Sequence, residues 1–96
     1  MKNLEVVWSN SAKSELKKIH DYWFYKRGAR QRAKNIVSDI LKSTRSITFL
    51  TQYQQDEIES DYRRIVVRDY KLLYKEISGK IVILKIVATR KEPKSF

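Results

Sequence analysis

The segment at residues 81–88 constrains the fold of this 96-residue chain more than any other part of the sequence. It reads IVILKIVA, so aliphatic side chains occupy both alternating sets of positions. A strand that is apolar on both faces belongs in the middle of a sheet, because a strand with one solvated face alternates apolar and polar residues. We therefore predict a sheet in which this segment is a central strand.

Three further segments have the character of strands. Residues 4–8 and 62–67 are short and rich in β-branched and aromatic side chains, and residues 70–77 follow the second of them closely. Residues 68–69 leave room only for a tight connection. Residues 78–79, a Ser-Gly pair, predict a two-residue hairpin turn, because glycine readily adopts a positive φ.

Two amphipathic helices separate the first strand from the others. Apolar residues recur at helical spacing from about residue 11 to about residue 26, and again from about 29 to about 48. Residues 9–11, Ser-Asn-Ser, favour the N-cap of the first helix, and Gly28 suits its C-terminal end. The short link between the helices predicts an antiparallel hairpin.

The predicted order of elements is β-α-α-β-β-β, and the fold class is α+β. The helical hairpin is expected to pack on one face of a twisted, mostly antiparallel sheet, while the other face carries charge and stays open. Trp8 and Trp23 are expected in the core where the first strand meets the first helix. Residues 1–96 are expected to form one domain, since the sequence has no repeat, linker or low-complexity tract.

The charge of the chain narrows its possible partners. Lys and Arg number 21 against 11 Asp and Glu, which gives a formal net charge of +10. Such a surplus implies a polyanionic partner, most simply nucleic acid, or an acidic protein. The sequence has no Cys and one His, which excludes thiol chemistry and argues against a metal site. We expect no cofactor, no membrane span and a cytoplasmic location.

The middle of the chain, residues 46–60, is acidic and polar. It contains no Lys or Arg, and its acids are Asp56, Glu57 and Glu59. We interpret it as a solvated acidic loop, because its spacing matches no calcium-binding loop. The single histidine, His20, is expected to be a partly exposed residue on the flank of the first helix, since nothing nearby in the sequence orients it as a base.

Basic side chains of the last strands are the candidate functional residues. Alternation places Arg64 and Arg68 on one exposed face, and Arg63 on the face of its apolar neighbours. Arg90 follows the central strand. When RNA is cleaved by attack of its own 2′-hydroxyl, cationic side chains can stabilise the transition state and no metal is needed. Arg64, Arg68 and Arg90 are therefore the candidate catalytic residues. Phosphate contacts and base stacking give the candidate nucleic-acid-binding residues, which are Arg63, Lys71, Lys75, Lys85, Tyr70 and Tyr74.

A structural interpretation of these residues stays open. The cations of the strands can form a solvated face whose tyrosine rings fill the edge of the core. Arg90 can cap the sheet or bind the acidic segment. Composition alone does not choose between the two interpretations.

The chain resembles the RelE/ParE superfamily, the toxins of bacterial type II toxin–antitoxin modules. The similarity covers nearly the whole chain. It lies in the opening Val6-Val7-Trp8-Ser9 with the helix that follows, the Ala33…Ile36…Ile40 spacing, the Arg-then-Tyr-x-x-x-Tyr pattern of residues 62–74, and the final strand with its terminal Arg in residues 83–93. The resemblance implies a growth inhibitor held inactive by a cognate antitoxin, which wraps an extended or helical segment around the toxin.

The superfamily divides by target. RelE-like members cleave mRNA in the ribosomal A site, whereas ParE-like members poison DNA gyrase. The arginines of the sheet favour ribosome-dependent mRNA cleavage as the predicted function, with the ribosome and mRNA as partners. The alternatives are a gyrase inhibitor without ribonuclease activity, which the long paired helices favour, and an inactive remnant. Phe96 departs from the C-terminal Tyr or His of the ribonucleases, and a Phe side chain cannot transfer a proton.

Overall fold

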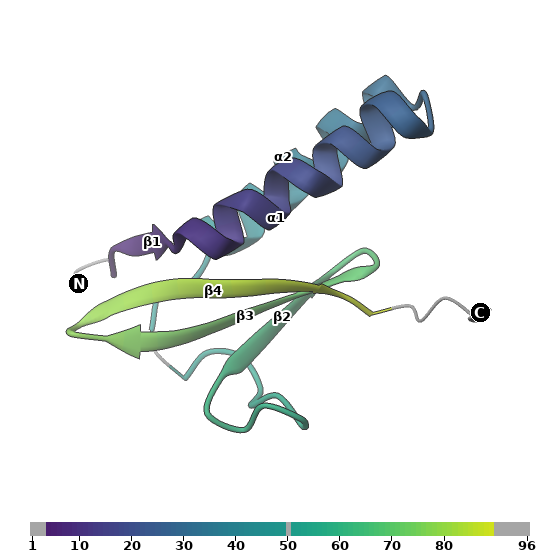
Figure 1. Cartoon of the computed structure of the whole chain (residues 1–96). Coiled ribbons are helices and arrows are strands. Elements are labelled where there is room, and N and C mark those ends of the chain that lie inside the picture. Colours follow the sequence, from purple (N-terminus) through teal and green to yellow (C-terminus); the bar gives the residue numbers. More distant parts are fainter. Residues whose placement is uncertain (1–3, 50, 90–96) are drawn as a thin grey trace.

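The structure, a computed structural model, describes residues 4–49 and 51–89. Two helices joined in a hairpin lie over one face of a four-stranded sheet, as Figure 1 shows. The elements are β1 (Val6–Trp8), α1 (Asn10–Asp21), the π-helix η1 (Tyr22–Lys26), α2 (Arg30–Arg45), β2 (Arg63–Val67), β3 (Tyr70–Ile77) and β4 (Lys80–Ala88). The predicted α+β class and the β-α-α-β-β-β order are confirmed.

The sheet has the strand order β1-β4-β3-β2. Strand β4 pairs with β3 in antiparallel fashion and with β1 in parallel fashion, so the segment that is apolar on both faces is central, as predicted. Strands β2 and β3 are antiparallel, with Ile65 opposite Leu72, and Leu72 is in turn opposite Ile86. The register between β3 and β4 shifts at Leu73/Tyr74.

Three tight connections depend on positive φ. Ser78 and Gly79 have φ values of 54° and 79°. Positive φ at both residues is typical of a two-residue hairpin turn, because the twist of such a turn matches the twist of the two strands. Gly28, between the two helices, has a φ of 65°. Arg68 also has a positive φ, 56°, although it carries a bulky side chain. Arg68 therefore leaves the extended geometry of β2, with consequences for where its side chain points.

Helix α1 begins with a side-chain cap. The Ser9 hydroxyl accepts a hydrogen bond of 3.0 Å from the Ala12 N–H and donates one of 3.2 Å to the Leu84 carbonyl, which ties the helix start to β4. The helical path continues beyond Asp21 as the π-helix η1, in which the Arg27 N–H reaches the Tyr22 carbonyl at 3.0 Å. The single predicted helix of residues 11–26 is thus an α-helix followed by a π-helix, and α2 is shorter than predicted.

The core lies between the helical hairpin and the sheet. Its fully or nearly buried members come from α1, α2, the segment after α2 and strands β2 to β4. They are Ala12, Ile36, Ile40, Ile47, Ile65, Val67, Leu72, Tyr74, Ile81, Ile83 and Ile86. Trp8 and Trp23 are partly buried and pack against this cluster. Trp8 lies where β1 meets α1, as predicted, whereas Trp23 belongs to η1, beyond the other end of α1, so its predicted position is wrong. Among the described residues, no helix has the length and apolar character needed to cross a membrane.

Candidate functional site

Four predicted site residues share the face of the sheet that points away from the helices, which we call the outer face. Ile65, Leu72 and Ile86 point into the core, so side chains at neighbouring positions alternate to the opposite side. Arg64 lies opposite Leu73, and Leu73 is opposite Lys85, in one row across three strands. The predicted cations on this face are Arg64, Lys71, Lys75 and Lys85.

Part of the outer face is covered by the acidic segment. Asp56 is only 2% exposed, and its Oδ1 lies 2.7 Å from Lys71 Nζ and 3.8 Å from an Arg64 guanidinium nitrogen. Its Oδ2 accepts backbone N–H bonds from Ile58 and Glu59, at 3.1 and 2.8 Å. The prediction of a solvated loop is therefore wrong at Asp56. This carboxylate folds the segment back onto two basic strand residues.

Two lysines of the outer face contact an aromatic ring. Lys75 Nζ lies 5.4 Å, and Lys85 Nζ 5.6 Å, from the centre of the Tyr62 ring. These distances are within the range of a cation–π contact. The Tyr62 ring therefore contacts two cations of the same chain.

Arg63 and Arg68 lie elsewhere. Arg63 is on the helix-facing side of β2 and donates a hydrogen bond of 2.6 Å to the Tyr53 carbonyl. Arg68 Nε lies 2.8 Å from Asp39 Oδ2 on α2. The expectation that Arg64 and Arg68 share a face is wrong, because the positive φ of Arg68 ends the alternation that the expectation assumed.

The predicted stacking residues Tyr70 and Tyr74 belong to the core side of the sheet. Tyr74 is 0% exposed, and this burial raises the pKa of its hydroxyl above the ordinary value. Tyr70 is half-buried, and its hydroxyl accepts a hydrogen bond of 2.9 Å from Trp23 Nε1. A fully buried ring has no face for a base, so Tyr74 cannot stack on nucleic acid in this fold. Arg90 and Phe96 lie outside the described residues.

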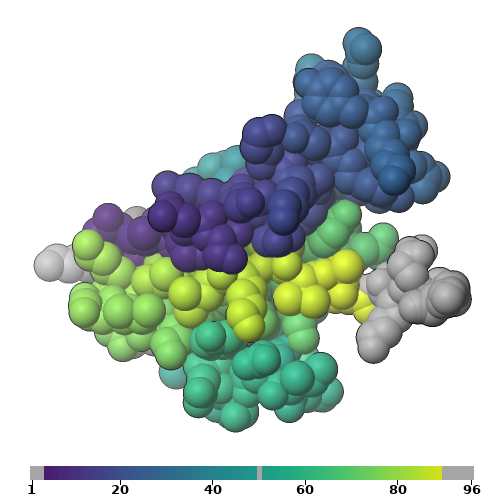
Figure 2. All heavy atoms as spheres, viewed as in Figure 1, coloured from purple at the N-terminus to yellow at the C-terminus, as the bar shows by residue number. Residues whose placement is uncertain are grey.

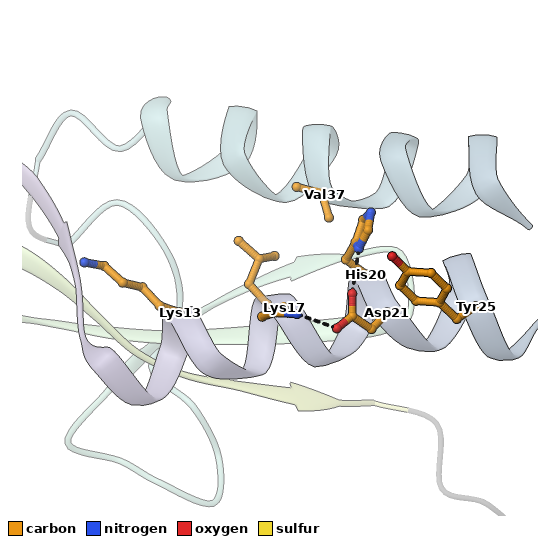
Figure 3. A pocket seen from close by; sticks show the side chains of 7 residues that line it. Lys13, Lys17, His20, Asp21, Tyr25 and Val37 are labelled. Atoms are coloured by element: carbon orange, nitrogen blue, oxygen red, sulfur yellow. Dashed lines mark hydrogen bonds and ion pairs between the residues drawn. The ribbon is translucent and has the colours of Figure 1, made fainter.

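A groove that was not foreseen in the sequence runs between α1 and α2. It has a volume of about 470 Å³, and Figure 3 shows the side chains that line it. They are Lys13, Leu16, Lys17, His20, Asp21, Tyr25 and Val37. The i, i+4 spacing of Lys13, Lys17 and Asp21 was the one signal in the sequence that could have placed three charges on one helix face.

Asp21 organises the charges of this groove. Its two oxygens lie 2.7 Å from Lys17 Nζ and 3.0 Å from His20 Nδ1. The hydrogen bond from Lys17, and after it the one with His20, lowers the pKa of the Asp21 carboxyl. His20 is partly exposed on α1, as predicted, but the reason given for that prediction is wrong, because Asp21 lies within hydrogen-bond distance of its ring. Within the described residues, no group of three His, Cys, Asp or Glu side chains could hold a metal ion.

The outer face predicts a specific response to acid. The hydrogen bond from Lys71, followed by the one from the Glu59 N–H, lowers the pKa of Asp56 below its ordinary value of 3.8. A carboxyl with a lowered pKa in the folded state stabilises the fold above the unfolded-state pKa and loses that contribution as the pH falls through the folded-state value. We expect the melting temperature of the wild type to fall more steeply below about pH 4 than that of Asp56→Asn, in calorimetric scans from pH 6 to pH 3. If the melting temperatures of the two proteins fell in parallel as the pH is lowered, this role of Asp56 would be contradicted.

Comparison with known proteins identifies the family. A family model described as the ParE toxin of the type II toxin–antitoxin system parDE matches residues 6–93. A solved chain of the chromosomal ParDE system from P. aeruginosa shares the fold with a TM-score of 0.74 and 17% sequence identity, over 91% of this chain and 97% of that chain. No curated protein matches the sequence. The resemblance to the RelE/ParE superfamily is confirmed. Because the family match extends over most of the sequence, the chain belongs to the ParE toxin family of type II toxin–antitoxin systems.

Proposed function

We propose that this toxin inhibits bacterial growth by binding DNA gyrase, and that it has no ribonuclease activity of its own. Membership of the ParE family carries the proposal, because ParE-like members of the superfamily are those that poison gyrase. Ribosome-dependent mRNA cleavage, the function favoured by the arginines of the sheet, becomes the second candidate.

The positions of the predicted catalytic arginines support the same choice. A ribonuclease that uses the 2′-hydroxyl of RNA needs its cationic groups to converge on one phosphate. Arg64 instead lies 3.8 Å from Asp56 on the outer face, and Arg68 lies 2.8 Å from Asp39 on α2. Each guanidinium already faces a carboxylate of the same chain, and the two belong to opposite sides of the sheet.

The same proposal includes a cognate antitoxin that neutralises the toxin. The family is defined by a toxin–antitoxin pair, and the net charge of +10 favours an acidic partner. Binding to the folded toxin alone would raise its apparent stability by mass action.

Incorporation of labelled precursors after induced expression tests the proposed target. Labelled thymidine and methionine are followed in the same culture of a susceptible bacterium. A gyrase poison blocks DNA synthesis first, so we expect thymidine incorporation to fall before methionine incorporation, together with induction of the DNA-damage response. A culture that expresses the chain with a stop codon at Asn10 is the control.

A purified system separates the two candidates further. We expect the full chain to make gyrase convert supercoiled plasmid to linear DNA when the reaction is stopped with detergent, and to leave mRNA intact on translating ribosomes. A fall in methionine incorporation first, with mRNA cut on the ribosome and plasmid uncut, would overturn the proposal in favour of the second candidate.

A further inference from the structure

The junction of the two helices forms a basic projection, residues 22–34, which we call the hairpin tip. It comprises η1, the link at Gly28 and the first turn of α2. Figures 1 and 2 show the far end of the hairpin, coloured blue, projecting away from the sheet. At the base of the tip, the Trp23 indole N–H donates a hydrogen bond to the Tyr70 hydroxyl of β3. The tip carries five cations and no Asp or Glu. They are Lys26, Arg27, Arg30, Arg32 and Lys34, and all five are exposed.

The arginines of the tip are fixed on aromatic rings. The guanidinium carbons of Arg27 and Arg32 lie 5.5 and 4.6 Å from the centre of the Trp23 ring. The Arg30 guanidinium carbon lies 5.3 Å from the centre of the Phe24 ring, and His20 stacks on the same ring at 5.1 Å. Such contacts hold a guanidinium in place without using its charge in an ion pair.

The π-helix brings these groups together. Four consecutive aromatic residues, YWFY at positions 22–25, form most of η1, and Tyr22 packs edge-on against Trp23 with ring centres 5.3 Å apart. Arg27 also donates a hydrogen bond of 3.3 Å to the Tyr22 hydroxyl. Short π-helical insertions occur frequently at functional sites, because they displace side chains from ordinary helical positions.

The charge of the tip is not neutralised within the fold. Across the described parts of the chain, none of the five tip cations is within ion-pair distance of a carboxylate. The outer face differs, because its cations Arg64 and Lys71 share the buried carboxylate of Asp56. An exposed and pre-positioned guanidinium array fits the oxygens of phosphate groups.

We propose that the hairpin tip binds the phosphate backbone of duplex DNA. A single strand would require open ring faces on which bases stack. In the tip, the Trp23 ring is in contact with two guanidinium groups, and the Phe24 ring with one guanidinium and an imidazole. The exposed rings of the tip are those of Tyr22 and Tyr25, at 41% and 73%, whereas all five of its cations are exposed. Charge therefore outweighs stacking surface at the tip, which favours a partner that is recognised through its phosphate backbone. This inference goes beyond the proposed function, because it requires neither gyrase nor antitoxin.

A pair of charge-matched variants of the full chain tests the proposal. Arg30→Gln/Arg32→Gln removes two tip cations, and Lys42→Gln/Arg45→Gln removes two exposed cations from the last turns of the same helix. The sites are separated by roughly 19 Å along the helix axis, given about 1.5 Å per residue. Each variant lowers the net charge from +10 to +8, because two cations are removed. Binding is measured by fluorescence anisotropy on a labelled DNA duplex, over a series of salt concentrations.

We expect the tip variant to bind the duplex about tenfold more weakly near physiological salt, with the slope of log K against log salt reduced by about 2. The slope measured for the control variant should differ from the wild-type slope by much less than the slope of the tip variant does. The variant Arg30→Lys/Arg32→Lys keeps both charges but loses the guanidinium groups that stack on the rings. Its affinity for the duplex should lie between those of the tip variant and the wild type. Melting curves of all variants establish that each is folded.

Equal weakening by the tip and control variants would overturn the proposal, because it would show that only net charge matters. A tip effect on a single-stranded RNA of equal length that is absent on the DNA duplex would also overturn it. Both results can be obtained whether or not the toxin acts on gyrase, so failure of this inference and failure of the proposed function are distinguishable.

Discussion

Replacing Tyr74 by alanine lowers the free energy of unfolding by about 4 kcal/mol, as expected for a large aromatic side chain removed from a core. Tyr74 is 0% exposed, packs among the core residues of the sheet and helices, and lies edge-on to Tyr53 with ring centres 6.4 Å apart. A domain of this size is stabilised by about 5–15 kcal/mol in total, so this variant should lose a large share of its stability and should arrest growth less effectively than the wild type.

Tyr74→Phe is the matched control. It keeps the ring and loses the hydroxyl, whose pKa is influenced by a hydrogen bond with the backbone of Tyr53, at an expected cost of about 1 kcal/mol. Urea unfolding followed by tryptophan fluorescence measures both variants. If Tyr74 instead stacked on nucleic acid, Tyr74→Ala would remain folded and lose binding, and that result would contradict the structure.

The strands of this toxin were predictable because their signals are local. The tight connection before residue 70 and the Ser78-Gly79 pair after residue 77 bound β3 at the residues that were predicted. The central place of β4 follows from aliphatic side chains on both of its faces. The burial of Tyr74 could also have been predicted, because Leu72 and Tyr74 share a face and Leu72 reads as a core residue.

The errors at the site come from long-range contacts and from backbone geometry. Alternation assumes an extended chain, and the positive φ of Arg68 ends it one residue after β2. The acidic composition of residues 46–60 gave no sign that one of its carboxylates would meet Lys71, fifteen positions further along. The π-helix was unpredictable for a similar reason, since its aromatic residues suit an ordinary helix equally well.

The ion pair between Asp56 and Lys71 gives the second large expected effect. Asp56→Asn keeps the size of the side chain and an oxygen that can accept the N–H groups of Ile58 and Glu59. It removes the negative charge beside Lys71, whose side chain is only 16% exposed, and so leaves a mostly buried cation without its partner. We expect the melting temperature to fall on the order of 10 °C.

A double-mutant cycle isolates this pair from its surroundings. Lys71→Met removes the cation at similar size and leaves the Asp56 carboxylate facing Arg64 alone, so this variant should also be destabilised. Because each single variant removes the main partner of a buried charge, the double variant Asp56→Asn/Lys71→Met should lose less than the sum of the two single losses. Additive losses would show that the two side chains do not stabilise each other.

The same variants determine what the outer face can do. In the wild type, Asp56 neutralises charge on Arg64 and Lys71 and holds the acidic segment over them. If that is its role, Asp56→Asn should bind RNA more tightly than the wild type at low salt, because two cations lose their internal counter-charge. The double variant, in which Lys71 is absent, should return part of the way to the wild-type affinity. Unchanged affinity in Asp56→Asn would mean that the acidic segment still covers the face, and that its backbone contacts rather than its charge hold it there.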